Sequence, residues 1–170
     1  EPEVDEGFDV RGGPLEPGAV AAWLADHAGD GRRCGLAVTG THAVYDGDAT
    51  ALAIAAADGD GAYLDTSILS PDDDAALARW LADPNQPKAL HEAKIAMHDL
   101  AGRGWTLAGV TSDTALAAYL VRPGQRSFSL DDLSLRYLRR ELRAEGPEQQ
   151  QLSLLDDAEG TDDQAVQTLI

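Results

Sequence analysis

Two Asp-Gly turns divide the first half of the chain into three short apolar runs, and this pattern constrains the fold strongly. The runs are residues 34–39, 49–57 and 62–65, and the turns between them are residues 46–48 and 58–61. Asp and Gly favour tight reversals because they tolerate the backbone angles that such turns require. The pattern therefore predicts a three-stranded antiparallel meander. The Ala-rich strands are assigned from their turns, since their own strand propensity is weak.

Helix signals alternate with short strand signals after the meander. Ser70 and Pro71 suit the cap and the first position of a helix, and Asp72 and Asp73 complement its positive end. A helix is expected between Ser70 and Asp83, with Leu77, Trp80 and Leu81 buried. A strand over 88–91, a helix over about 93–101 and a strand ending at 110–112 should follow. Two more helices are then expected: one that starts at Asp113 and buries Leu116, Tyr119 and Leu120, and one that starts at Ser129 and buries Leu133, Tyr137 and Leu138. This order predicts an α/β domain with a mixed sheet.

The opening segment predicts one more strand and one more helix. Gly12-Gly13-Pro14 is expected to break the chain, which leaves residues 8–11 as a short edge strand. Residues 15–27 then place Val20, Trp23 and Leu24 on one helical face.

The C-terminal part differs from the rest in composition. Residues 144–160 are rich in Gln and acidic residues around Leu152, Leu154 and Leu155, so we expect a flexible loop. Residues 161–170 begin with the spacing of a capping box and are expected to start a helix that is still incomplete at the end of the chain. We therefore expect one domain over residues 1–170, cut from a longer protein.

Charge is distributed unevenly along the chain. The formal net charge is −17, with 30 acidic and 13 basic residues. This balance disfavours a domain that binds nucleic acid by itself, because phosphate binding depends on Lys and Arg. Residues 101–143 carry seven basic and four acidic residues, a net charge of +3. The arginines at the end of this window are interpreted as a solvated helix face, with contact to DNA or to another domain as the alternative. They are Arg136, Arg139, Arg140 and Arg143.

Other residue types exclude several classes of site. The single cysteine, Cys34, excludes an internal disulfide and a cysteine zinc site, and it fits a reducing compartment. The sequence lacks a run of roughly twenty apolar residues and a signal-peptide pattern. We therefore expect a cytoplasmic monomer without a membrane segment. The histidines at positions 27, 42, 91 and 98 lack a zinc-protease spacing and are interpreted as isolated polar residues.

Residues 88–122 and 125–142 resemble the proofreading (3′→5′) exonuclease domain of bacterial DNA polymerase I. The first stretch reads KALHEAKIAMHDLAGRGWTLAGVTSDTALAAYLVR, and RSFSLDDLSLRYL in the second is similar to a family helix with an Asp-x-Leu centre. Asp113, Thr114 and Tyr119 also stand where the family has the same residue types. The resemblance covers most of the chain and implies an α/β, ribonuclease-H-like fold with a mixed five-stranded sheet flanked by helices.

The same resemblance implies that most of the family's metal-binding acids are missing. Where active members carry Asp-x-Glu on the first strand, this chain has Val38 and Gly40, and where they carry a helical Asp it has Ala96. The third motif, a Tyr four residues before an Asp, matches Glu159 and Asp163, so one carboxylate remains. Two-metal hydrolysis of a phosphodiester needs several charged oxygen ligands to hold ions about 4 Å apart. The resemblance therefore implies a domain without catalytic residues, bound metal or other cofactor.

A role and partners follow from the resemblance. The domain would act as a scaffold and spacer beside the polymerase domain of a longer polypeptide that synthesises and repairs DNA with magnesium and deoxynucleotides. A flap-nuclease domain of the same polypeptide would precede it, and it would meet DNA through the parent enzyme. The composition, rich in Ala, Gly, Asp and Arg, predicts a high-GC, actinobacterial source.

Two alternatives stay open at this point. The first is a weakly active exonuclease whose metal ligands have moved to Asp113, Asp131 and Asp163. The second is an acidic protein-interaction module in which residues 152–155 form the docking peptide.

Overall fold

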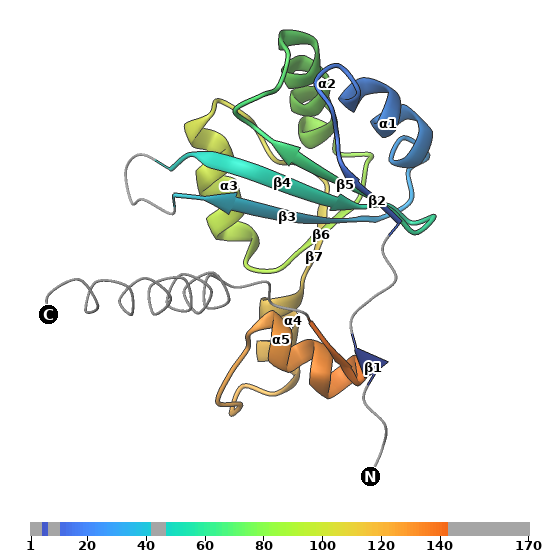
Figure 1. Ribbon diagram of the computed structural model, residues 1–170. Coiled ribbons are helices and arrows are strands. Elements are labelled where there is room, and N and C mark those ends of the chain that lie inside the picture. The colour runs from blue at the N-terminus through green and yellow to red at the C-terminus, as the bar shows by residue number, and fades with distance from the viewer. Residues whose placement is uncertain (1–4, 7–10, 42–46, 143–170) are drawn as a thin grey trace, which may run out of the picture.

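The computed structural model describes residues 5–6, 11–41 and 47–142, and its main feature is a six-stranded mixed sheet (Figure 1). The strands are β2 (Arg11–Pro14), β3 (Cys34–Gly40), β4 (Ala49–Ala55), β5 (Asp60–Asp65), β6 (Lys88–Leu90) and β7 (Val110–Asp113). Their order across the sheet is β2-β5-β4-β3-β6-β7.

The centre of the sheet confirms the predicted meander. Strand β4 pairs antiparallel with β3 and with β5, and β6 and β7 extend the sheet in parallel on the far side of β3. Along β3, alternate residues point to opposite faces of the sheet, which places Leu36 and Val38 on the face that carries the core. The helices that cross between parallel strands therefore lie on this face.

The sheet has six strands, and the expected number of five is wrong. An edge strand was expected over residues 8–11, and β2 instead spans Arg11–Pro14 and pairs in parallel with β5 through the Gly12-Gly13-Pro14 sequence that was expected to break the chain. Gly12 has a φ of +89°, and a Cβ atom there would overlap the carbonyl of Gly61, so only glycine permits this close pairing. Pro14 is tolerated because β2 is an edge strand.

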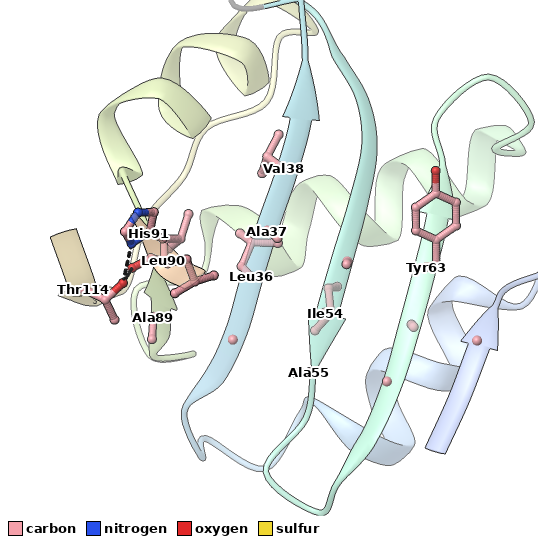
Figure 2. A pocket seen from close by; sticks show the side chains of 16 residues that line it. Leu36, Ala37, Val38, Ile54, Ala55, Tyr63, Ala89, Leu90, His91 and Thr114 are labelled. Carbon is pink, nitrogen blue, oxygen red and sulfur yellow. Dashed lines mark hydrogen bonds between the residues drawn. The ribbon is translucent and has the colours of Figure 1, made fainter. Parts of the chain in front are cut away.

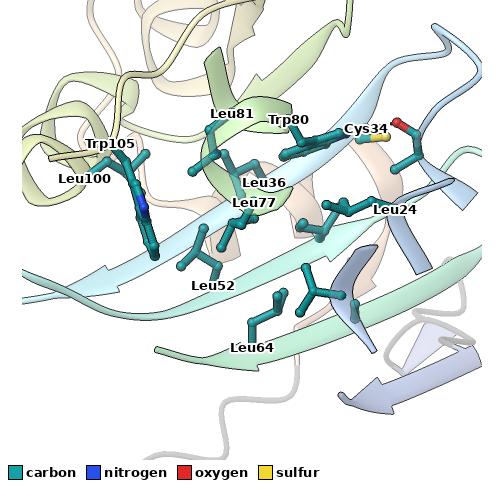
Figure 3. Packing of buried hydrophobic residues seen from close by; sticks show 14 of the residues in the cluster. Leu24, Cys34, Leu36, Leu52, Leu64, Leu77, Trp80, Leu81, Leu100 and Trp105 are labelled. Carbon is teal, nitrogen blue, oxygen red and sulfur yellow. Dashed lines mark hydrogen bonds between the residues drawn. The ribbon is translucent and has the colours of Figure 1, made fainter. Parts of the chain in front are cut away.

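Helices α1 (Val20–His27), α2 (Pro71–Ala82) and α3 (Ala93–Gly102) cover one face of the sheet, and their apolar residues form a single core with it (Figure 3). The predicted inward residues of α1 and α2 are buried. Helix α1 starts at Val20 and not at residue 15, because Gly18 turns the backbone with a φ of +90° and donates its N–H to the carboxylate of Asp73.

The start of α2 forms the predicted cap and also joins α1 to α2. Ser70 and Asp73 form a reciprocal capping box, as the sequence indicates. Asp73 is 1% exposed and also accepts the backbone N–H groups of Gly18 and Val20. Burial alone would raise the pKa of Asp73, but the hydrogen bonds from Gly18, Ser70 and Val20 lower it below its usual value.

A small second layer follows β7 and lies apart from the three covering helices (Figure 1). It contains α4 (Thr114–Val121), α5 (Leu130–Leu133), a π-helical turn η1 (Ser134–Leu138) and strand β8 (Arg140–Glu141), which pairs in parallel with β1 (Asp5–Glu6). The helix starts at Asp113 and Ser129 are confirmed, because both side chains accept backbone N–H groups as N-caps.

The burial predicted for this second layer is partly wrong. Leu116, Tyr119 and Leu120 are more than half exposed, and Ala118 is the buried residue of α4. Leu133 is buried as predicted, whereas Tyr137 and Leu138 are exposed. Because α4 is apolar on almost every side, its hydrophobic pattern cannot indicate which side packs inward.

Several sequence predictions lie outside the described residues. They concern residues 8–10 of the expected first strand, the loop over 144–160, the helix over 161–170, and His42, Asp46, Arg143, Glu159 and Asp163. Among the helices that the structure describes, none is long and apolar enough to cross a membrane.

Candidate functional site

Val38 and Ala96, two positions that the resemblance aligns with metal-binding acids, line the same small cavity. Val38 comes from β3 and Ala96 from α3, and the cavity between them has a volume of about 280 Å³. Its remaining lining residues are Leu36, Leu90, His91, Glu92 and Ile95. Strand β3 and helix α3 thus meet at these two positions, and the methyl groups of both residues offer no ligand atom for a cation.

The third position, Gly40, is closed by packing. A Cβ atom at Gly40 would overlap the carboxylate of Asp99 on α3 and would lie 2.7 Å from the carbonyl oxygen of Asp48. Asp99 is fully buried, so its carboxylate cannot swing into solvent without opening the core. Strand β3 is also irregular here, since its register with β4 shifts between Thr39 and Gly40. The volume where a side chain at position 40 would begin is occupied by Asp99.

Two further glycines hold α3 against the turn before β4. A Cβ atom at Gly102 would overlap the carbonyl of Gly47, and a Cβ atom at Gly47 would lie 2.6 Å from Nδ1 of His98 and 3.0 Å from the Asp99 carboxylate. Sequence reasoning missed this contact and the role of Asp99. The signal was an aspartate one turn after Ala96 on an otherwise apolar helix face, together with glycine at positions 40 and 102.

His91 and Glu92 are the polar residues of the cavity. Nδ1 of His91 lies 2.8 Å from the hydroxyl oxygen of Thr114, which orients the ring (Figure 2). Glu92 is exposed and adopts a left-handed backbone conformation at the cap of α3. Two such residues are too few to hold a pair of dications, and the described part of the chain contains no cluster of three His, Cys, Asp or Glu side chains that could hold a metal ion.

Asp113, one of the proposed relocated ligands, is used by the backbone. Its carboxylate accepts the N–H groups of Glu92 and Ala93 at the start of α3 and those of Ala115 and Leu116 at the start of α4. Burial would raise the pKa of Asp113, but these four hydrogen bonds lower it. Asp131 is exposed on α5, and Asp163 lies outside the described residues. The described geometry assigns Asp113 a structural role, as a cap shared by two helices.

The arginines lie on the second layer, but the expectation of one helix face is wrong, because η1 ends at Leu138 and Arg140 belongs to β8. Arg136 and Arg139 are exposed on or next to η1, and Arg140 is half-buried in β8. The carbonyl of Arg140 accepts the hydroxyl of Ser134 at 2.9 Å, which ties β8 to η1.

Lys88 is a buried residue whose role was not visible in the sequence. Its Nζ atom donates to the carbonyl oxygens of Asp83, Gln86 and Ala108 at 2.9–3.2 Å and lies 4.7 Å from the ring centre of Trp80. Burial lowers the pKa of Lys88. The Lys88 side chain therefore stabilises the loop between α2 and β6 through hydrogen bonds within the core, and it does not line the cavity of Val38 and Ala96.

Comparison with solved structures supports the fold. The POL domain of Pol1 from M. smegmatis, in complex with DNA primer-template and dNTP, superposes with a TM-score of 0.74 at 76% identity, over 79% of this chain and 24% of that chain. RNase D of Escherichia coli, an exoribonuclease, superposes with a TM-score of 0.63 at 17% identity, over 78% of this chain and 34% of that one. At that identity the second match concerns the fold alone, which is ribonuclease-H-like as the resemblance implied.

Comparison of sequences shows the family. Residues 42–145 match the family described as DNA polymerase I, ribonuclease H-like domain. DNA polymerase I of Mycobacterium tuberculosis is 79% identical over 169 residues and that of Mycobacterium leprae is 77% identical, in each case over 99% of this chain and 19% of the relative. Mycobacteria are actinobacteria, the group that the composition predicts. The chain thus spans about a fifth of the length of these relatives, and it belongs to the DNA polymerase I family as its ribonuclease-H-like, exonuclease-like domain.

Proposed function

We propose that this domain is a catalytically inactive 3′→5′ exonuclease-like module that serves as a scaffold and spacer beside a polymerase domain. The observation that carries the proposal is the state of three neighbouring positions. Val38 and Ala96 present methyl groups to a shared cavity, and the start of any side chain at Gly40 is blocked by Asp99.

The chemistry of exonucleolytic cleavage requires ligands that these positions lack. Two dications must be held about 4 Å apart so that one activates water and the other stabilises the leaving oxygen. Magnesium and manganese bind through oxygen ligands, several of them charged. A single remaining carboxylate at Asp163, which lies outside the described residues, would not bring two dications together.

The absence of acids at these positions also favours the folded state of a domain that binds no metal. Carboxylates clustered in a metal site repel one another when no metal is bound, and this repulsion disfavours the folded state. Valine and alanine remove that repulsion and extend the apolar core, since Ala96 is buried and Val38 packs against the same cluster. The scaffold is therefore stable without a cofactor of its own.

The proposed setting is a longer cytoplasmic DNA polymerase I, acting as a monomer in DNA replication and repair synthesis. The polymerase and flap-nuclease domains of the same polypeptide would be the direct neighbours, and magnesium would serve the polymerase reaction. Arg136, Arg139 and Arg140 would contact DNA or the polymerase domain. This assignment is supported by the identity to mycobacterial DNA polymerase I and by the match to a POL domain solved with primer-template.

The proposal is tested with the purified chain, a 5′-labelled single-stranded oligonucleotide and Mn²⁺, beside an exonuclease domain that carries all four acids. We expect the oligonucleotide to stay at full length over a time in which the control degrades it completely. Mn²⁺ titration followed by electron paramagnetic resonance should show no pair of coupled ions. Shortening of the oligonucleotide that Asp113→Asn, Asp131→Asn or Asp163→Asn abolishes would instead establish the relocated-ligand alternative.

A further inference from the structure

Helix α4 presents apolar side chains on a side that no other described element covers. Its sequence, TALAAYLV, contains no charged residue. Ala118 is its buried residue, whereas Leu116, Tyr119 and Leu120 are 62%, 53% and 80% exposed. A helix that is apolar on every side is normally covered on every side, because exposure of such side chains to water is unfavourable. We therefore expect another element to pack on the exposed side of α4.

The exposed side of α4 is distinct from the side that packs toward the rest of the second layer. Val121 lines a cavity that α4 shares with α5 and η1, and Leu116, Tyr119 and Leu120 do not. The three- and four-residue spacing of these three residues places them on one helix face. The ring of Phe128 lies 5.7 Å from that of Tyr119 in an edge-on arrangement, so the loop after α4 extends the same surface. We call Leu116, Tyr119, Leu120 and Phe128 the α4 patch.

The charged residues next to the α4 patch are all basic. Residues 114–128 contain two arginines and no acidic residue, in a chain with 30 acidic and 13 basic residues. Arg122 follows α4 directly and Arg126 lies two residues before Phe128, and both arginines are exposed. Neither guanidinium forms an ion pair within the described part of the chain. Aromatic and aliphatic residues with arginines at their edge are typical of protein interfaces, and they favour a partner surface that is apolar and bordered by acidic residues.

DNA fits this surface less well than protein does. Two arginines release few counterions, so their contribution to phosphate binding is small. Leu116 and Leu120 offer no aromatic face on which a base could stack, and the ring of Tyr119 already packs against Phe128. A protein surface is therefore the favoured occupant.

The longer polypeptide of the relatives supplies a protein surface at high effective concentration. This chain corresponds to 19% of DNA polymerase I of Mycobacterium tuberculosis and to 24% of the solved POL domain chain of M. smegmatis. Strands β1 and β8, at the two ends of the described part, pair with each other in the layer that also contains α4 (Figure 1). The flanking polypeptide is therefore joined to the layer that carries the α4 patch. Because domains of one polypeptide associate intramolecularly, a patch of modest size can hold them together.

We propose that the α4 patch is the docking surface for the polymerase domain of the same polypeptide. Leu116 and Leu120 pack into an apolar surface of that domain, and Arg122 and Arg126 lie opposite acidic residues at its border. This inference rests on the proposed function in one respect, namely that a polymerase domain is the neighbour in the chain. It does not depend on whether the exonuclease-like domain is catalytically inactive.

The test is site-specific photocross-linking in the purified full-length polymerase. Leu120 is replaced by p-benzoyl-L-phenylalanine, the protein is irradiated, and the joined peptides are identified by mass spectrometry. Ile68 is the matched control position, because it is an aliphatic residue that is 50% exposed in the loop between β5 and α2, outside the second layer. We expect the probe at Leu120 to join peptides of the polymerase domain at least tenfold more than the probe at Ile68.

Other cross-linking results would overturn the proposal. Peptides from this domain, from the flap-nuclease domain or from a second polymerase molecule would assign the α4 patch to a different protein surface. Cross-links to an added primer-template would assign the patch to DNA. A yield at Leu120 no greater than that at Ile68 would show that no partner covers the patch.

A charged substitution gives an independent readout in the full-length enzyme. Leu120→Glu should increase the rate of proteolytic cleavage between the two domains at least fivefold, with unchanged far-UV circular dichroism, whereas Ile68→Glu should leave that rate within twofold. An unchanged rate in Leu120→Glu would contradict the docking surface. Degradation of the oligonucleotide in the exonuclease assay would refute the proposed inactivity alone, since that assay does not involve the α4 patch.

Discussion

The contact between Gly40 and Asp99 makes a quantitative prediction about why the site is closed. In Gly40→Ala, the added methyl group would overlap the Asp99 carboxylate and would lie 2.7 Å from the carbonyl of Asp48. Overpacking of a core by one methyl group typically costs about 1–3 kcal/mol. We expect the upper half of this range, because Asp48 contributes a backbone atom and Asp99 is fully buried, so neither can move freely.

The partner substitution, Asp99→Ala, should relieve part of this overlap. By itself it removes a buried carboxylate and should cost about 1–3 kcal/mol. In the double variant the methyl group at position 40 occupies the volume that Asp99 vacates. We therefore expect the double variant to be at least about 1 kcal/mol more stable than the sum of the two single effects implies, as is typical of residues in direct contact.

The measurement is urea unfolding followed by far-UV circular dichroism, with unchanged m-values as the condition for comparing midpoints. Gly35→Ala is the matched control, because a Cβ atom there would lie 3.6 Å from that of Ala55, an ordinary contact. Its effect should add to that of Asp99→Ala. If Gly40→Ala and Asp99→Ala also add to within about 0.5 kcal/mol, the packing argument is wrong.

Three further predictions concern the residues that hold the scaffold together. Lys88→Ala should destabilise the chain by about 3 kcal/mol in urea unfolding, because three carbonyl groups lose their donor in the core, and a change below about 1 kcal/mol would contradict this. Asp73→Ala should cost about 2–4 kcal/mol at pH 7. Since folding lowers the pKa of Asp73, that difference should be present above the usual value of 3.8 and shrink as pH falls below it, so a constant difference would refute the assignment. His27→Ala should destabilise the folded chain more at pH 5.5 than at pH 9. The hydrogen bond to Asp58 raises the pKa of His27, so the stabilisation from this pair is lost as the pH rises. A larger destabilisation at pH 9 would show that the His27–Asp58 pair does not stabilise the fold.

The sequence predicted the elements whose signals are local. The meander followed from its Asp-Gly turns, and the starts of α2 and α4 followed from Ser70 and Asp113, whose caps involve residues a few positions away. The meeting of Val38 and Ala96 came from the family resemblance, because no local pattern relates a strand residue to a helix residue 58 positions later.

Features that depend on distant contacts were missed. An edge strand was predicted, but its extension over Gly12-Gly13-Pro14 was missed, because that pairing requires Gly12 to approach Gly61 and the sequence alone indicates only a break. The orientation of α4 depends on which neighbour covers it, and an all-apolar helix carries no information about this choice. Asp99 was missed for the same reason, since its buried position is set by β3 and by the turn at Gly47.

The same packing indicates what single substitutions toward a metal site would do at these positions. Val38→Asp or Ala96→Asp would add one acid to a cavity in which Glu92 supplies the other carboxylate, and two carboxylates are too few to hold a pair of dications. Gly40→Glu cannot be accommodated until Asp99 is removed, and removal of Asp99 first costs a buried interaction. Each step alone therefore lowers stability before any metal pair can form and compensate. Under the proposed function, a metal pair at these positions would therefore require acids at positions 38, 40 and 96 together with the removal of Asp99.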